Sequence, residues 1–222
     1  MEDFVYIEKT EEMDMKVLLV NGSAKEHGCT DTALHEAAKT LEQEGILTEV
    51  FWVGSGSLRD CIGCGQCNTK QEGCIFDDDC VNTLIAKAKD ADGFLFGSPV
   101  YYAHPSGRIL SVMDRAFYSG KKAFLHKPAA AVVSARRAGT TASIDVLNKY
   151  FTLAEMPVVS SSYWNMTHGN QPQEVKEDLE GLQIMRNLGR NMAWLLKCIE
   201  SGKNQGILAP ENEYTHRTGF IR

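Results

Sequence analysis

The segment Lys16-Val-Leu-Leu-Val-Asn21 is a short, continuous apolar run that stops at Gly22-Ser23. A run of this length between turn residues is typical of a strand buried on both faces, as in a parallel sheet. The next segment, 30–44, repeats apolar residues at helical spacing and ends before Gly45. Strand, loop and helix in this order predict the first unit of an α/β protein.

The same alternation continues along the chain. We expect further strands at 47–53, 93–97, 129–134 and 157–160, and further helices at 79–91, 106–118, 140–154 and 174–201. Parallel strands need crossover helices of this length, so the pattern predicts a doubly wound, five-stranded parallel sheet with helices on both faces. The number of strands fits the flavodoxin-like order 2-1-3-4-5.

Length, charge and the terminal segments narrow the class of protein. A chain of 222 residues suits one α/β domain, which we place at 15–201, with an N-terminal extension at 1–14 and a C-terminal arm at 202–222. A formal charge of -6 gives no electrostatic reason to expect a nucleic-acid partner. The first residues lack the features of a signal peptide, and no run approaches the roughly 20 apolar residues of a membrane span. We therefore expect a cytoplasmic protein with no membrane partner.

Three unusual loops follow the first, third and fourth expected strands, where a sheet of this kind binds its ligand. The first loop, 21–32, contains neither a dinucleotide fingerprint nor a nucleotide triphosphate loop. It offers the hydroxyls of Ser23 and Thr30, the cation of Lys25 and the free N–H groups at the start of a helix. These groups suit a phosphate monoester, and a capped polar turn without a ligand is the alternative.

The second and third loops suit a planar ring. In the second loop, 97–107, two prolines fix the backbone, while Tyr101 and Tyr102 offer a flat apolar wall to a heterocycle. The alternative is that these tyrosines are core or interface aromatics. The third loop, 134–141, brings Arg136, Arg137 and a helix N-terminus to the same end of the sheet. Positive potential there would stabilise a ring that becomes anionic on reduction.

Together with Met113-Asp-Arg115, these loops resemble the NADPH-dependent FMN reductase family of flavodoxin-like proteins, from about Met15 to the end of the last expected helix. The resemblance implies a non-covalently bound FMN and assembly into a homodimer or homotetramer. It assigns the phosphate to Ser23, Lys25, Cys29 and Thr30, the ring to Pro99, Val100, Tyr101 and Tyr102, and the pyrimidine edge to Ser134, Arg136, Arg137 and Gly139. Many relatives carry Asn where this chain has Cys29, whose backbone N–H can still serve the phosphate.

The chemistry implied by this resemblance is a two-step electron relay. NAD(P)H gives a hydride to FMN and leaves, and a small-molecule acceptor then takes the electrons. The flavin carries this chemistry, so we identify no catalytic side chain. A non-enzymatic flavin and iron-sulfur protein that transfers electrons to a protein partner is the alternative.

Four of the seven cysteines lie within residues 61–74, CIGCGQCNTKQEGC, at the spacing C-x2-C-x2-C-x6-C. The spacing leaves three alternatives open: one [4Fe-4S] cluster, bare or redox-active thiols, and zinc. The motif resembles the compact cysteine motif of the iron-sulfur flavoproteins, a branch of the same family, which implies a cluster on Cys61, Cys64, Cys67 and Cys74.

The position of this motif and of the remaining cysteines carries further expectations. The motif follows the second strand, so we expect it at the same end of the sheet as the flavin. There it would be near enough to exchange electrons with a flavin, including that of a neighbouring subunit. We expect Cys80 and Cys198 to be packing residues.

Overall fold

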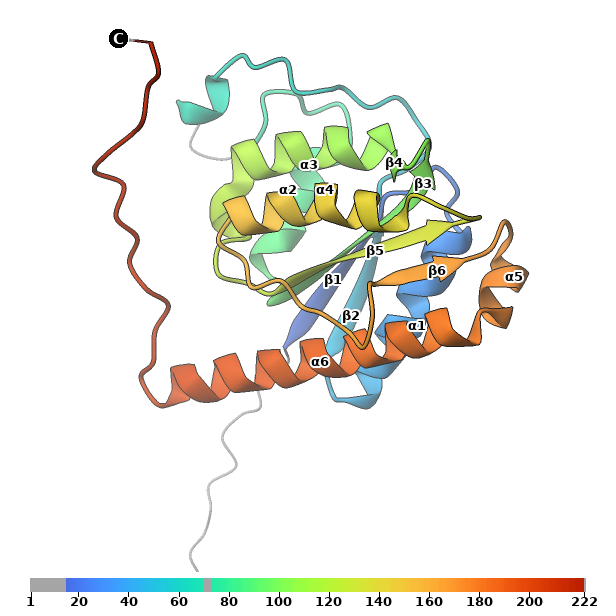
Figure 1. Ribbon diagram of the computed structural model, residues 1–222. Helices are drawn as coiled ribbons and strands as arrows, with labels where there is room; N and C mark the ends of the chain where they lie inside the picture. Colours follow the sequence, from blue (N-terminus) through green and yellow to red (C-terminus); the bar gives the residue numbers. More distant parts are fainter. Residues whose placement is uncertain (1–14, 70–72, 222) are drawn as a thin grey trace, which may run out of the picture.

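The computed structural model describes residues 15–69 and 73–221, so the expected N-terminal extension at 1–14 lies outside the described residues. A central parallel sheet lies between two layers of helices (Figure 1). Its strands follow the order β2-β1-β3-β5-β6. Their bounds are Lys16–Asn21 for β1, Leu47–Trp52 for β2, Gly93–Tyr101 for β3, Ala129–Ala135 for β5 and Met166–His168 for β6.

The predicted flavodoxin-like fold is confirmed, with one additional strand. The two-residue β4, His104–Pro105, pairs antiparallel with the end of β3 and lies outside the parallel order. When β4 is left out of the numbering, the parallel strands have the predicted order 2-1-3-4-5.

The fifth parallel strand was predicted at the wrong residues. Within 157–160 only Val158 forms a bridge to β5, opposite Ala129. The chain then leaves the sheet and returns as β6, where Met166 pairs with Val133. The fifth position of the sheet is therefore shared by two short segments, because both find partners on the same strand, β5.

Helices cover both faces of the sheet. Their bounds are Cys29–Gln43 for α1, Val81–Lys89 for α2, Gly107–Gly120 for α3, Thr140–Leu153 for α4, Pro172–Glu177 for α5 and Leu179–Asn204 for α6, with short 3-10 turns η1 at Gln66–Asn68 and η2 at Lys121–Ala123. Alternate residues of β1 point to opposite sides: Leu18 packs in the core with α2, α3 and α4, and Leu19 packs in the core with α1 and α6. Burial on both faces explains the continuous apolar run with which β1 begins the fold.

The last helix is divided, where the sequence predicted one helix at 174–201. The Asp178 carboxylate accepts a hydrogen bond from Gly181 N at 2.9 Å and one from His168 N at 2.7 Å. Asp178 thus caps the start of α6 and joins it to the end of β6.

The described residues contain no helix long and apolar enough to cross a membrane.

The C-terminal segment leaves the body of the protein after α6, which ends at Asn204. Residues 205–221 run as an extended arm whose Tyr214 hydroxyl donates to Glu155 at 2.6 Å.

The prediction for Cys198 is wrong, because its side chain on α6 is exposed, whereas the half-buried Cys80 does pack against the core. The expected homodimer or homotetramer stays a prediction.

Close packing between α1 and α6 gives a stability test. A Cβ added at Gly189 would lie 2.9 Å from both Ala37 O and Thr40 Cβ. We expect Gly189→Ala to lower the free energy of unfolding by about 1–3 kcal/mol, because the two helices must move apart. Gly202→Ala on the same helix is the control, since its nearest neighbour would be Ile207 Cβ at 3.8 Å. Denaturant unfolding measures both, and an equal loss of stability in the two variants would contradict this packing argument.

Candidate functional site

The carboxyl ends of β1, β3 and β5 meet at one end of the sheet. Asn21 lies opposite Gly97, and Pro99 lies opposite Ser134. The parallel register therefore places the three loops that the sequence singled out next to one another. The contacts that hold each loop define the site.

The first loop is organised by the buried side chain of Asn21. Its Oδ1 accepts from Ser23 N at 3.1 Å, and its Nδ2 donates to Glu26 O at 2.9 Å. Ser23 Oγ in turn accepts from Lys25 N at 3.0 Å, and Trp52 Nε1 of β2 donates to Ser23 O at 2.8 Å. These bonds fix a tight loop ahead of α1, and sequence analysis missed the role of Asn21 in building it.

The start of α1 leaves donors available in the described structure. No side chain caps this helix, so the N–H groups of its first turn have no partner from a capping residue. Thr30 is buried and Lys25 is exposed. Burial raises the pKa of the Cys29 thiol, which donates to Gly169 O at 3.6 Å. A neutral thiol, free N–H groups and a nearby ammonium form an environment that suits an anion.

The second loop is a tight hairpin between β3 and β4. Tyr102 and Ala103 at its tip both have positive φ, 51° and 58°. This backbone conformation is unusual for residues other than Gly, Asn and Asp, and it costs about 1–3 kcal/mol for each residue. The hairpin presents Tyr101 and Tyr102, of which Tyr102 is fully exposed, so both rings are accessible at the carboxyl end of the sheet.

The third loop packs directly on that hairpin. Gly139 has φ 99°, and a Cβ there would lie 2.4 Å from Ala103 Cα. Arg136 and Arg137 are exposed on the same loop. Ser134, in contrast, is buried, and its hydroxyl is 3.0 Å from the Thr167 hydroxyl of β6. The structure therefore directs the Ser134 side chain toward β6, and only its backbone is left to face a ligand.

Hydrogen bonds join the three loops into one unit. Gly22 N donates to Gly97 O at 2.9 Å, and the Ser106 hydroxyl donates to Gly22 O at 3.1 Å. On the other side Gly169 N donates to Ala135 O at 3.0 Å and so connects Cys29 with the third loop. Gly169 was missed as a link because nothing in its own sequence neighbourhood indicates a contact with residue 29.

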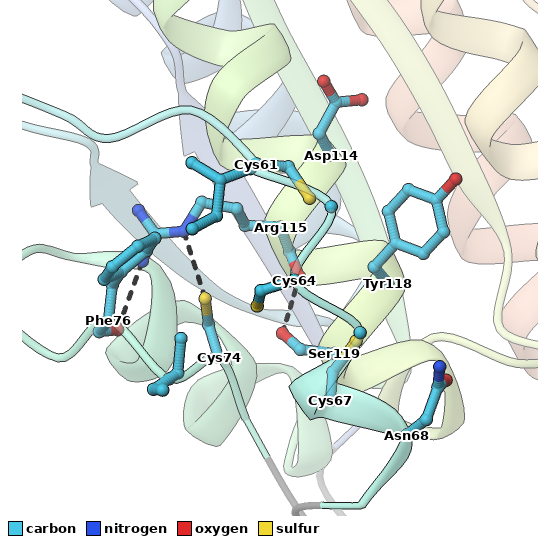
Figure 2. A pocket seen from close by; sticks show the side chains of 14 residues that line it. Cys61, Cys64, Cys67, Asn68, Cys74, Phe76, Asp114, Arg115, Tyr118 and Ser119 are labelled. Atoms are coloured by element: carbon cyan, nitrogen blue, oxygen red, sulfur yellow. Dashed lines mark hydrogen bonds between the residues drawn. The ribbon is translucent and has the colours of Figure 1, made fainter.

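The four clustered cysteines line a separate cavity of about 590 Å³ between their loop and α3. Figure 2 shows Cys61, Cys64, Cys67 and Cys74 around this space, which we call the cysteine cavity. Cys61 and Cys64 are exposed, whereas Cys67 and Cys74 are partly buried. Within 15–69 and 73–221, no three or more His, Cys, Asp or Glu side chains are gathered closely enough to hold a metal ion as they stand, so a metal bound here would require the cysteine side chains to draw together.

The expectation that the cysteines lie at the flavin end of the sheet is wrong. The chain leaves β2 at that end and then follows α3 along its length: Arg108 Nη2 donates to Gly56 O at 2.8 Å, and Ser111 bonds Asp60. The part of α3 that lines the cysteine cavity runs from Asp114 to Ser119. At about 1.5 Å per helical residue, this stretch of α3 lies roughly 12 to 20 Å from Ser106. Within one chain, α3 separates the two sites.

Comparison with known proteins places this architecture in a family. The model of the NADPH-dependent FMN reductase family matches residues 15–171. An iron-sulfur flavoprotein of Methanocaldococcus jannaschii is 34% identical over 197 residues, which cover 84% of this chain and 100% of that protein.

Solved structures share the fold at lower identity. RosB, solved with 8-demethyl-8-formylriboflavin-5'-phosphate bound, has a TM-score of 0.63 at 14% identity, with 94% of this chain and 92% of that chain covered. An archaeal flavodoxin has a TM-score of 0.55 at 15% identity, with 82% and 99% covered. These similarities show that the chain shares the fold of these proteins. The family match extends over most of the chain, which therefore belongs to the NADPH-dependent FMN reductase family.

Proposed function

We propose that this protein is an FMN-dependent oxidoreductase that takes electrons from NAD(P)H and passes them to a small-molecule acceptor. The observation that carries the proposal is the joining of the three loops at the carboxyl end of the sheet through Gly22, Gly97, Ala103 and Gly139. Bound FMN would accept a hydride and release electrons, and the protein would supply binding, orientation and electrostatics.

The first loop fits the phosphate group. A phosphate monoester carries close to two negative charges and needs several donors. The N–H groups of Cys29 and Thr30 at the uncapped start of α1 and the exposed ammonium of Lys25 meet that need. Burial moves the pKa of the Cys29 thiol further above neutral pH, so the thiol adds no negative charge beside the phosphate.

The hairpin and the third loop fit the ring. Tyr101 and Tyr102 offer exposed aromatic surface next to Pro99 and Val100. The hairpin tip has positive φ values at Tyr102 and Ala103, and Gly139 packs directly against it because Gly139 has no Cβ. Arg136 and Arg137 supply positive charge at the pyrimidine edge, where a reduced flavin gains negative charge.

FMN binding is tested at Gly139. We expect Gly139→Ala to raise the FMN dissociation constant at least tenfold, about 1.4 kcal/mol, because its new methyl group would displace Ala103 and the hairpin. Titration of FMN fluorescence measures the constant. Gly56→Ala, in the chain after β2 and outside the three loops, is the matched control, since its Cβ would have no neighbour within 4 Å. A wild-type protein that binds no FMN would contradict the proposed function itself.

Turnover distinguishes an enzyme from an electron carrier. With FMN bound and an acceptor present, we expect steady-state oxidation of NADPH or NADH at many turnovers per flavin, followed by absorbance of the nicotinamide. The reason is that a reductase takes its electrons directly from the nicotinamide, whereas a carrier must be reduced by another protein. Negligible oxidation by FMN-loaded protein would reject the reductase and favour the carrier.

We further propose that Cys61, Cys64, Cys67 and Cys74 hold one [4Fe-4S] cluster. The support is that four thiols line one cavity of about 590 Å³, and four thiolates are the donor set of such a cluster. Cys61 and Cys64 lie on the exposed part of the loop, and Cys64 stands between Gly63 and Gly65, where the backbone can adjust as ligands close on iron. A bound cluster would handle electrons one at a time.

The cluster is tested by removal of one exposed thiol. Anaerobically purified wild type is expected to contain about four irons and four sulfides per chain. We expect Cys64→Ala to lose most of this iron and to keep FMN affinity, because the cysteine cavity and the flavin loops lie at different parts of α3. Cys198→Ala, another exposed cysteine, should keep both. Wild-type protein without iron after anaerobic handling would rule out the cluster.

A further inference from the structure

We propose that Arg115 is the positioning residue of the cysteine site, closing the cysteine loop against α3 and holding a positive charge beside Cys74 so that reduction of a cluster there is favoured. This inference rests on the proposed cluster.

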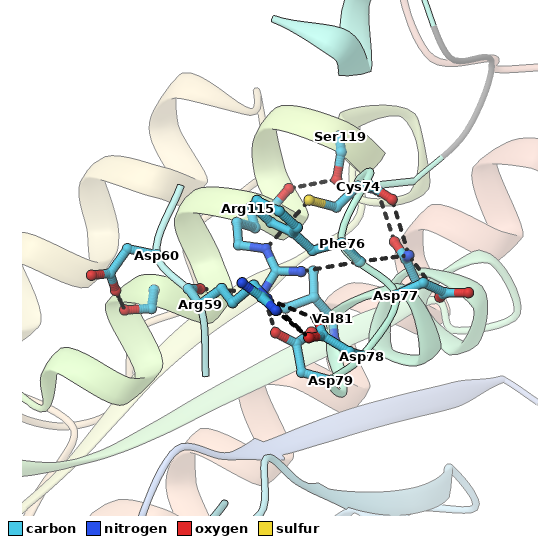
Figure 3. A network of polar contacts seen from close by, with 12 residues as sticks. Arg59, Asp60, Cys74, Phe76, Asp77, Asp78, Asp79, Val81, Arg115 and Ser119 are labelled. Atoms are coloured by element: carbon cyan, nitrogen blue, oxygen red, sulfur yellow. Dashed lines mark hydrogen bonds and ion pairs between the residues drawn. The ribbon is translucent and has the colours of Figure 1, made fainter. Parts of the chain in front are cut away.

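Arg115 is a charged side chain in a buried position. It lies on α3 with 1% of its side chain exposed, and it uses every nitrogen of the guanidinium. Nε donates to Cys74 Sγ at 3.3 Å, Nη1 to Arg59 O at 3.2 Å and Nη2 to Phe76 O at 3.2 Å. Nη1 also pairs with the Asp79 carboxylate, whose side chain is 4% exposed (Figure 3).

These contacts join the two stems of the cysteine loop. Arg59 precedes Cys61 by two positions, and Phe76 follows Cys74 by two positions. One guanidinium therefore ties the chain before the first cysteine to the chain after the last one. Among the described residues of α3, no other side chain donates a hydrogen bond to both stems.

Cys74 is the cysteine with the best-defined position. Asn82 of α2 accepts from Cys74 N at 2.8 Å and donates to Cys74 O at 3.1 Å, so the backbone is held on both sides. Arg115 then fixes the sulfur. Cys61 and Cys64 are exposed and Cys67 lies between exposed residues, so Cys74 is the fixed point from which a bound cluster would be oriented.

Arg115 keeps its charge in this environment. A guanidinium stays protonated in proteins, and the buried Asp79 carboxylate pairs with it here. The guanidinium carbons of Arg115 and Arg59 lie 5.5 Å and 5.0 Å from the centroid of the Phe76 ring, so both side chains make a cation–π contact with it.

A donor and a positive charge at a ligand sulfur favour the reduced cluster. Reduction adds one electron, and hydrogen bonds to cluster sulfurs together with nearby cations stabilise the added negative charge. Lysine cannot reproduce this arrangement, because an ammonium lacks the planar fork that reaches Cys74, Phe76 and Asp79 at once.

The test compares cluster potentials in protein reconstituted with iron and sulfide. For R115K we expect the equilibrium constant for cluster reduction to fall at least tenfold, which is a shift of about 59 mV to more negative potential for a one-electron couple. The double variant R115Q/D79N removes both buried charges together, so neither partner is left unpaired, and it should shift in the same direction. Iron content and melting temperature are measured alongside.

The matched control is R59Q. It removes a neighbouring positive charge that lies over Phe76 and pairs with Asp78 but contacts no sulfur, and it should keep the wild-type potential. Wild-type potentials in R115K or R115Q/D79N, or a shift in R59Q as large as theirs, would overturn the role of Arg115 while leaving the cluster in place. Failure of both Arg115 variants to fold would also overturn it, because Arg115 would then serve general stability. Absence of iron in wild type would reject the cluster itself.

Discussion

The close approach between the ends of β1 and β3 is the constraint on which the flavin end of the molecule depends. A side chain at Gly22 would lie 2.7 Å from Gly97 O, and one at Gly97 would lie 2.8 Å from Thr30 and Leu34. Because neither position carries a Cβ, the first loop and the start of α1 can lie directly against β3. The same approach brings Gly22 O within 3.1 Å of the Ser106 hydroxyl, so α3 begins at the site as well.

Local sequence patterns predicted most of the sheet and all three loops. The apolar run at 16–21 is buried on both faces, and such burial leaves a clear local signal. The fifth strand has no such signal, because Val158 and Met166 are placed by their shared pairing with β5 rather than by their own neighbours. The division at Asp178 also depends on a tertiary contact, the bond from His168 N.

In the candidate site, too, local groups could be predicted from the sequence, whereas contacts between distant segments could not. Hydroxyls, tyrosines and arginines in loops were recognisable as groups that suit a phosphate and a ring. Contacts between distant segments were not, such as Gly169 with Cys29 or Arg115 with Cys74. The path of the cysteine loop was misjudged for the same reason: the order of strands fixes where the loop begins, but the contacts of Arg108, Ser111 and Arg115 decide where it goes.

One helix, α3, contacts both candidate sites. Its N-cap Ser106 bonds Gly22 at the flavin end, and its last turns line the cysteine cavity. Loops can rearrange, but an uninterrupted helix of 14 residues cannot shorten without breaking its own hydrogen bonds. The distance between Ser106 and the turns of α3 that line the cysteine cavity is therefore set by the helix. Electron transfer between the two sites inside one chain would therefore depend on which groups are bound at each end of α3, and not on a change in the length of the helix.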